Sequence, residues 1–199
     1  MNKKALVLAT RNRDKSREIR DIFRASGIII WDVSEFPQAP EVEETGKTLE
    51  ANALLKARTI FKILKLPVLA DDTGLEVLAL NNAPGVYSAR YAGENVSYEE
   101  NNYKLLHEMF TVPAGKRAAR FRCVSAFVAE GVEHTVEGTC TGAIATELRG
   151  KQGFGYDPLF IPMGFDKTFA ELDMETKNRL SHRAEAFRAM KDYLIKLDF

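Results

Sequence analysis

The sequence predicts an α/β fold whose mixed, strongly twisted and elongated β-sheet is flanked by helices. Residues 5–70 alternate apolar runs with helical periodicities in the order β-α-β-α-β, which favours parallel strand pairs. Two long strand-like segments, 117–129 and 132–147, then follow one another across a tight turn. The 199 residues are 45% apolar, so the whole chain, 1–199, can bury a full core as one domain.

Three strands and two helices are expected in the first half of the chain. The strands are expected at residues 5–9, 28–33 and 67–70, each a short apolar run. The first helix, 12–25, carries Ile19, Ile22 and Phe23 on its inner face and ends near Gly27. Thr48 caps the second helix, whose apolar stripe is Ala53, Ala57, Ile60, Phe61 and Leu64.

The second half is expected to be less regular. A short strand at 76–80 precedes a turn-rich stretch at 81–85. A helix at 98–110 is predicted to turn Tyr103, Leu106 and Phe110 inward. A short strand at 159–161 precedes a C-terminal helix, whose buried stripe is Phe187, Met190, Leu194 and Leu197.

Charge and cysteine usage indicate the setting in which the protein works. Lys+Arg and Asp+Glu number 28 each, which argues against nucleic acid or an anionic membrane as the main partner. No apolar run approaches ~18 residues and the start does not resemble a signal peptide, so a soluble, cytoplasmic protein is expected. A hairpin turn at 130–131 would place Cys123 and Cys140 diagonally, ~7–8 Å apart, which favours reduced thiols.

Two adjacent carboxylates, Asp71 and Asp72, define the first candidate site. They follow the predicted strand at 67–70, which Gly74 is expected to end, and ligands bind at the carboxyl ends of strands in open α/β sheets. Successive side chains on a strand face opposite ways, so one carboxylate is expected in the site and the other in a supporting position. The alternative is ordinary turn chemistry in an Asp-Thr-Gly segment.

A second candidate is the turn between the first strand and the first helix, which carries Thr10, Asn12 and Lys15. Free N–H groups at a helix start attract phosphate, and these side chains add hydrogen-bonding groups and a positive charge. The turn lacks the glycines of a Walker loop. Ordinary capping by Thr10 or Asn12, with Lys15 in solvent, is the alternative and the more frequent case.

An acidic loop at 41–46 is the third candidate. Acidic loops are usually solvated surface. Together with Asp72, however, a loop carboxylate could hold one Mg²⁺, which takes one or two carboxylates and leaves its other positions to water and phosphate. Lys56, on the following helix, could then neutralise phosphate charge.

Two further candidates lie near the C-terminus. Gly153 and Gly155 flank Phe154, so the backbone can approach a flat ligand on which the ring stacks. A β-turn with core aromatic residues is the alternative and the more common case. The other candidate is Lys177 together with the segment 181–183. The alternative for this segment is a surface position, in which Ser181 caps a helix and the charged residues after it are solvated.

Taken together and in this order, these motifs resemble the inosine triphosphate pyrophosphatase family, the non-canonical purine nucleoside triphosphate pyrophosphatases. The resemblance covers nearly the whole chain, and the matching segments are residues 10–18, 43–48, 52–57, 70–77, 83–91, 153–158 and 177–183. Three positions depart from the family pattern. Arg11 replaces a usual Gly, Thr73 replaces a more common Ser, and Ala51 stands where many members carry Glu.

The resemblance implies an activity and an architecture. The enzyme would hydrolyse ITP, dITP and XTP to the monophosphate and pyrophosphate with Mg²⁺ as cofactor, so cleansing the nucleotide pool. It would be a homodimer of two-lobed chains, each with the nucleotide in a cleft between the lobes.

The resemblance also implies a role for each candidate residue. Glu44 and Asp72 would ligate Mg²⁺, and Asp72 would also orient or deprotonate the attacking water. The phosphates and sugar would be bound by Thr10, Asn12, Lys15, Lys56, Thr73 and Lys177. Phe154 would stack on the base in a pocket shaped by Gly155, Tyr156 and Asp157. His182 and Arg183 would donate hydrogen bonds to the oxygen at position 6 of the base.

Two alternatives to this function differ in their chemistry. Enzymes of a related fold hydrolyse pyrimidine nucleoside triphosphates at a similar bond, and a panel of nucleotides distinguishes the two activities. A protein that senses nucleotides without turnover would need the phosphate-binding turn but not Asp72. Because every expected catalytic position is present, the sequence favours the enzyme.

Overall fold

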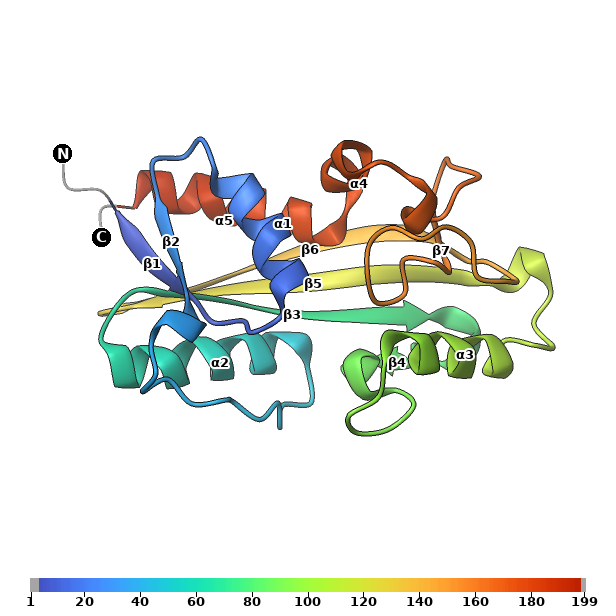
Figure 1. Ribbon diagram of the computed structural model, residues 1–199, viewed down its shortest axis with the longest axis horizontal. Helices are drawn as coiled ribbons and strands as arrows, with labels where there is room; N and C mark the ends of the chain where they lie inside the picture. Colours follow the sequence, from blue (N-terminus) through green and yellow to red (C-terminus); the bar gives the residue numbers. More distant parts are fainter. Residues whose placement is uncertain (1–3, 198–199) are drawn as a thin grey trace. The chain divides into compact units, whose positions relative to one another are not determined.

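The computed structural model describes residues 4–197, so residues 1–3 and 198–199 of the predicted domain lie outside the described residues. Within them the sheet has seven strands in the order β2-β1-β3-β5-β6-β7, with β4 added on β3 (Figure 1). Their bounds are β1 Ala5–Leu8, β2 Ile29–Asp32, β3 Val68–Val77, β4 Pro84–Gly85, β5 Ala118–Ala129, β6 Val132–Ile144 and β7 Phe160–Pro162. β1 is parallel to β2 and β3, whereas β3–β4 and β6–β7 are antiparallel. The predicted mixed sheet is confirmed.

The helices are α1 Arg13–Phe23, α2 Leu49–Leu64, α3 Tyr98–Glu108, α4 Met174–Leu180 and α5 His182–Lys196. The chain divides into two compact units. The first consists of Met1–Asp72, Cys123–Gly138 and Arg183–Phe199, and the second of Thr73–Arg122 and Thr139–His182. The boundaries fall within β3, β5 and β6 and just after His182, so both units draw on several separate parts of the chain.

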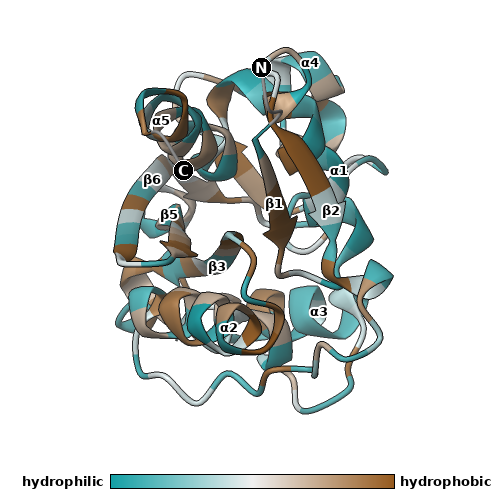
Figure 2. Ribbon diagram, turned by 90° about the vertical axis from the view of Figure 1, so that its left-hand side faces the viewer, coloured by the Kyte–Doolittle hydropathy of each residue, from teal (hydrophilic) through white to brown (hydrophobic). Residues whose placement is uncertain are grey.

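The core of the first unit forms where α1 and α5 pack on one face of its strands, while α2 covers the other face (Figure 1). Ile19 of α1 and Met190 of α5 are fully buried beside Leu6 and Leu8 of β1. Figure 2 shows β1 in the hydrophobic colour and α1 as largely hydrophilic, as expected of an amphipathic helix on a buried strand. The predicted caps are present, because Asn12 precedes α1 and Thr48 precedes α2.

The core of the second unit is rich in aromatic rings. Phe121 of β5 lies 4.7 Å from Phe160 of β7, measured between ring centroids, and 6.2 Å from Phe169. Leu75 of β3 and Leu105 of α3 complete this cluster and are fully buried. The second unit therefore has its own hydrophobic core rather than forming an extension of the first.

β3 is longer than the sequence predicts, and the expected strand end at Gly74 is wrong. The strand continues to Val77, so Asp71 and Asp72 lie in its middle, and the predicted strand at 76–80 is the end of β3 followed by a 3₁₀ turn at Leu78–Leu80. Leu75 and Glu76 pair with β4, and β5 runs along β3 as its neighbour in the sheet. Ladder hydrogen bonds on a buried central strand outweigh the turn propensity of Asp-Thr-Gly.

The predicted inner face of α3 is partly wrong. Tyr103 and Phe110 are 55% and 87% exposed, and only Leu106 packs against the core as expected. Asn102 occupies the inner face instead, where its amide donates a hydrogen bond to the Gly155 carbonyl (2.9 Å). A buried polar side chain with a backbone partner is stable in the interior, so the apolar spacing alone gives the wrong helix phase.

The hairpin, the thiols and the last helix agree with the sequence predictions. β5 and β6 are joined through Glu130 and Gly131, and Gly131 has the positive φ (67°) that a tight hairpin turn requires. Cys123 and Cys140 are both buried free thiols. The α5 stripe of Phe187, Met190 and Leu194 is buried, with Leu197 partly so. None of the described helices is long and apolar enough to cross a membrane.

Candidate active site

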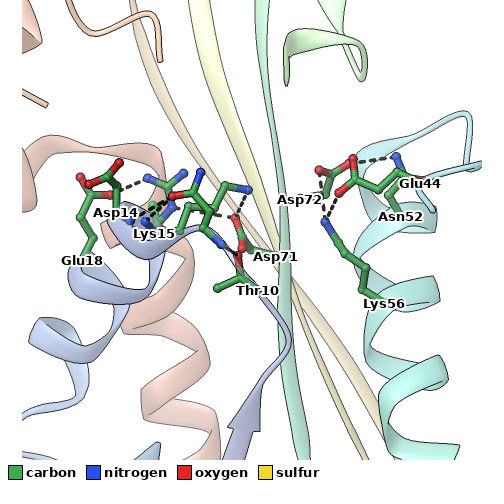
Figure 3. A network of polar contacts seen from close by, with 11 residues as sticks. Thr10, Asp14, Lys15, Glu18, Glu44, Asn52, Lys56, Asp71 and Asp72 are labelled. Atoms are coloured by element: carbon green, nitrogen blue, oxygen red, sulfur yellow. Dashed lines mark hydrogen bonds and ion pairs between the residues drawn. The ribbon is translucent and has the colours of Figure 1, made fainter. Parts of the chain in front are cut away.

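In the first unit, charged side chains gather on both sides of the middle of β3. Asp71 and Asp72 are adjacent, and their carboxylates point to opposite faces of the strand, as the alternation of strand side chains requires (Figure 3). Both are buried. The prediction that the two carboxylates have different surroundings is therefore confirmed, although they occupy the middle of the strand rather than its end.

Asp71 faces α1 and the start of α5. Its Oδ2 atom lies 3.0 Å from Nζ of Lys15 and 3.8 Å from Nε of Arg183, and Nη1 of Arg183 donates to Oε2 of Glu18 (2.5 Å). Burial alone would raise the pKa of Asp71, but the charges of Lys15 and Arg183 hold that pKa far below its ordinary value. Asp71 is therefore an ionised carboxylate within a buried network of alternating charges.

Asp72 faces α2 and the acidic loop. Its Oδ1 atom lies 3.5 Å from Nζ of Lys56, and the same ammonium group donates a short hydrogen bond to Glu44. Burial raises the pKa of Asp72; Lys56 opposes this effect and the charge of Glu44 adds to it. Two carboxylates thus share one cation, and the raised pKa makes Asp72 the more readily protonated of the two strand carboxylates.

Asn52 holds the acidic loop against Asp72. Its Nδ2 donates to Oδ2 of Asp72 (3.0 Å), while its Oδ1 accepts from the backbone N–H of Gly46 (2.7 Å). Gly46 is required there, because a Cβ atom would lie 2.5 Å from Oδ1 of Asn52. Asn52 and Lys56 are four residues apart and share one face of α2.

The oxygen atoms around Lys56 are suited to a hard divalent cation. Glu44 and Asp72 supply carboxylates that already converge on one positive charge. No group of three or more His, Cys, Asp or Glu with metal-binding geometry occurs among residues 4–197. Mg²⁺ needs no such cage, because it usually takes one or two protein carboxylates and leaves its other positions to water and phosphate oxygens. The residues present therefore fit this ion.

In the turn before α1, the side chain of Asn12 caps the helix and that of Thr10 holds the turn itself. Oδ1 of Asn12 accepts from the backbone N–H groups of Asp14 (3.0 Å) and Lys15 (3.1 Å), and Oγ1 of Thr10 accepts from that of Asn12 (3.2 Å). The capping interpretation of this turn is thus correct for Asn12, and a phosphate contact stays a prediction. Lys15 is not in solvent as that interpretation expects, because it pairs with Asp71.

In the second unit, the glycine-rich loop closes around Asp157. Oδ2 of Asp157 accepts from the backbone N–H of Phe154 (2.8 Å) and from Nζ of Lys177 (2.6 Å), and Lys177 also lies 4.8 Å from the centroid of the Phe154 ring. Gly153 has φ +75°, and a Cβ atom there would lie 2.0 Å from Oδ2 of Asp157. The loop thus presents an aromatic ring over a buried ion pair.

The remaining predicted base contacts are buried, which contradicts the surface interpretation of residues 182–183. His182 stacks on Phe121 with 4.5 Å between ring centroids, and His182 and Arg183 are 4% and 3% exposed. Tyr156 donates its hydroxyl to the Ser88 carbonyl (2.8 Å), and burial raises the pKa of this phenol. Their predicted contacts with the base stay predictions.

Each unit thus brings together part of the predicted set, together with residues that the sequence analysis missed. The first unit gathers Thr10, Asn12, Lys15, Glu44, Lys56, Asp71, Asp72 and Arg183; the second contains Thr73, Tyr156 and His182 and gathers Phe154, Gly155, Asp157 and Lys177. Glu18 and Asn52 were missed as site residues, as was Tyr98, whose ring centroid lies 6.0 Å from that of Phe154. The available signal for the first two was helical spacing, since Glu18 follows Lys15 by three residues and Asn52 precedes Lys56 by four.

Known proteins resemble this chain over nearly its whole length. The model of the Ham1 family matches residues 6–193. A dITP/XTP pyrophosphatase from Geobacter sulfurreducens is 50% identical over 190 residues, covering 95% of this chain and 96% of that protein. One from Thermoanaerobacter pseudethanolicus is 46% identical over 191 residues, covering 96% of each chain. The solved structure of a HAM1 protein from Coxiella burnetii is 41% identical with a TM-score of 0.89, covering 98% of this chain and 100% of that one. The chain therefore belongs to the Ham1 family.

Proposed function

We propose that this chain hydrolyses the non-canonical purine nucleoside triphosphates dITP, XTP and ITP to the nucleoside monophosphate and pyrophosphate. Relatives named dITP/XTP pyrophosphatases match it over nearly their full lengths at 46–50% identity. The observation that carries the proposal is the ammonium group of Lys56, shared by Glu44 and Asp72, beside a second lysine–carboxylate pair on the other face of β3. Triphosphate hydrolysis needs both metal-binding carboxylates and cations that offset phosphate charge.

In the proposed reaction, the oxygen of a water molecule attacks the α-phosphorus, and the bond from that phosphorus to the bridging oxygen breaks. Asp72 orients the water and accepts its proton, as a buried carboxylate beside the acidic loop can do. Lys15 and Lys56 offset the charge of the phosphates, and pyrophosphate leaves with the bonding electron pair. Asp71 stays ionised and holds Lys15 in place.

Mg²⁺ is the proposed cofactor, and Glu44 and Asp72 are the residues that would hold it. When bound, the ion would neutralise phosphate charge during the displacement. Removing divalent cations with EDTA should abolish turnover, and Mg²⁺ should restore it. Turnover that persists after exhaustive chelation would contradict this part of the proposal.

Base selection is proposed to rest on one aromatic ring and on two side chains that donate hydrogen bonds. Phe154 offers a stacking ring, and His182 and Arg183 would donate to the oxygen at position 6 of hypoxanthine or xanthine. Adenine carries an amine there, so its binding would leave buried donors unpaired at a cost of ~1–3 kcal/mol each. Hydrogen-bonding sites of this kind can discriminate by as much as ~10⁴-fold.

Initial rates with equal concentrations of dITP, XTP, ITP, dATP and dUTP test the function. The three non-canonical purine nucleotides should be hydrolysed at least about 100-fold faster than dATP, as a site built on hydrogen bonds allows. Preference for dUTP would instead indicate a pyrimidine triphosphatase, and tight binding without turnover would indicate a nucleotide sensor.

We also expect a homodimer, formed around the segment 84–87 that follows β3. Pro84 and Gly85 form the short strand β4, and Tyr87 beyond it is 58% exposed. A two-fold dimer would cover this partly apolar surface. Light scattering at micromolar concentration should give twice the chain mass, and a value of one chain mass would contradict the dimer. A cytoplasmic location stays a prediction.

A further inference from the structure

A pocket lined by polar and charged residues lies along a different face of α1 from the one that carries Lys15. It has a volume of about 530 Å³ and is lined by four arginines, Arg11, Arg13, Arg17 and Arg20, with Asp32 of β2 as its one carboxylate within the described residues. All of these residues belong to the first unit.

Helix geometry separates this pocket from the carboxylates of β3. Arg13, Arg17 and Arg20 are spaced four and three residues apart, so they share one face of α1. Lys15 and Glu18 lie roughly on the opposite face. From there Lys15 pairs with Asp71 (Figure 3), and Glu18 accepts a hydrogen bond from Arg183. The pocket and the carboxylate site have in common only the turn before α1, where Thr10 and Asn12 also line the pocket.

The pocket carries an excess of positive charge. Asp32 accepts hydrogen bonds from Arg20 (2.7 Å) and from the Ser16 hydroxyl (2.6 Å), and Glu35 lies 3.8 Å from the same guanidinium group. Arg20 and its carboxylate partners therefore offset one another, and the positive excess comes from the other three arginines. The Arg17 side chain is 67% exposed, and its ion pair with Asp14 is long, at 3.9 Å. Solvent weakens such a pair.

Arg11 and Arg13 add to this excess. Arg11 donates to the Ala39 carbonyl (2.8 Å), a neutral partner that leaves its charge uncompensated. Guanidinium groups present planar pairs of donors that match phosphate oxygens two at a time. Several such groups around one cavity therefore suit an anion with several phosphate oxygens.

The chemistry of the lining restricts the ligand further. Every side chain around the pocket is polar or charged. Among the described residues, no aromatic side chain lines the pocket for a nucleobase to stack on, whereas a small and highly charged anion finds several charged donors. The lining thus favours a phosphate group without a base.

We propose that this arginine pocket binds a condensed inorganic phosphate, pyrophosphate or a longer chain, at a site separate from the catalytic carboxylates. Pyrophosphate is a product of the reaction proposed above. The choice of pyrophosphate as the ligand therefore rests on that proposed function. A product held in the pocket would lie against the turn formed by Thr10 and Asn12. Pyrophosphate would then inhibit turnover through this turn even when substrate is saturating.

Isothermal titration with pyrophosphate tests the site without requiring turnover. The full-length protein is first saturated with the α,β-methylene analogue of dITP at fixed free Mg²⁺, and pyrophosphate is then added. One pyrophosphate should bind per chain. The variant Arg13→Ala/Arg17→Ala should bind it roughly 100-fold more weakly, because each charge-assisted contact is worth about tenfold or more. Arg24→Ala, at the end of the same helix and outside this pocket, should bind it as the wild type does.

Each other outcome has a defined meaning. If the saturating analogue abolishes pyrophosphate binding, the pocket holds the triphosphate tail of the substrate and the separate site is wrong. Equal binding by the double variant and the wild type would also overturn the proposal. If sulfate binds the pocket as tightly as pyrophosphate does, the pocket holds an adventitious ion only and the proposal is wrong. Because the titration needs no hydrolysis, a protein that binds pyrophosphate but leaves dITP intact would contradict the proposed function and not this pocket.

Discussion

Asp71 and Asp72 are neighbours in β3, and each of their carboxylates meets a different lysine. Oδ2 of Asp71 lies 3.0 Å from Lys15, and Oδ1 of Asp72 lies 3.5 Å from Lys56. Burial raises the pKa of both carboxyls. At Asp71 the charges of Lys15 and Arg183 outweigh the effect of burial on the pKa, whereas at Asp72 the charge of Lys56 does not. Two adjacent residues of the same type are thereby adapted to different tasks, and their Asn variants should fail in different ways.

Asp72→Asn should reduce kcat for dITP by at least ~100-fold, as expected for loss of a general base. The fold should persist, because the amide keeps the shape of the side chain and can still contact Asn52. Steady-state kinetics and thermal unfolding measure the two effects. A variant with wild-type kcat at saturating Mg²⁺ would remove Asp72 from the mechanism.

Asp71→Asn should chiefly destabilise the protein, by about 3 kcal/mol or more in the free energy of unfolding. Asp71 is 1% exposed, and its loss leaves Lys15 and Arg183 with one buried counter-charge fewer. Urea denaturation of the two Asn variants, measured side by side, checks this difference. Equal stability of the two would show that the buried network does not depend on the charge of Asp71.

Gly153→Ala should weaken nucleotide binding as well as stability. The residue has φ +75°, and the added Cβ would lie 2.0 Å from Oδ2 of Asp157, displacing that carboxylate from Lys177. We expect KM for dITP to rise about tenfold, the equivalent of roughly one charged hydrogen bond. Gly164→Ala is the matched control, since its φ is +86° with nothing within 4 Å of the added atom. Identical effects of the two substitutions would reduce the role of Gly153 to backbone strain.

Glu76 should make the stability of the protein depend on pH. Burial would raise its pKa, but hydrogen bonds from Arg122 and Arg120, both 2.7 Å, lower that pKa below its ordinary value. A carboxyl whose pKa is lower in the folded protein than in the unfolded chain stabilises the fold at any pH above the unfolded pKa of about 4.3. That stabilisation is lost as the pH falls through the folded pKa. At pH 7 the free energy of unfolding of the wild type should exceed that of Glu76→Gln by about 1 kcal/mol. The difference is modest because the Arg120 side chain is 46% exposed to solvent.

Urea denaturation of wild type and Glu76→Gln at pH 7 and pH 3 measures this dependence. The difference in stability should shrink at pH 3, where the protonated carboxyl resembles the amide. Glu99→Gln, an exposed position in the first turn of α3, controls for a general effect of losing one charge. A difference that grows as pH falls would have the wrong sign for this network.

Local rules predict those parts of the fold and site that depend on neighbouring residues. Asn12 and Thr48 cap their helices because the cap bonds lie within three residues. The opposite orientations of Asp71 and Asp72 follow from the two-residue period of a strand. The sequence motifs also identify the family, as the match over residues 6–193 confirms.

Long-range partners account for most of what the sequence predictions missed. β3 continues through Gly74 because neighbouring strands pair with it. Arg183 is buried rather than exposed because its partner Glu18 lies 165 residues away in the sequence. Asn102 turns inward because a carbonyl 53 residues further on accepts its hydrogen bond. Such contacts determine which residues are buried and which face of a helix turns inward, and neither composition nor periodicity reveals them.

The position of bond cleavage tests the central claim, and hydrolysis of dITP in ¹⁸O-labelled water measures it. Attack on the α-phosphorus predicts dIMP that carries ¹⁸O in its phosphate, with unlabelled pyrophosphate as the other first product and no dIDP at early times. Mass spectrometry of the separated products gives the result directly. Release of dIDP with orthophosphate, or ¹⁸O in the pyrophosphate, would contradict the proposed reaction.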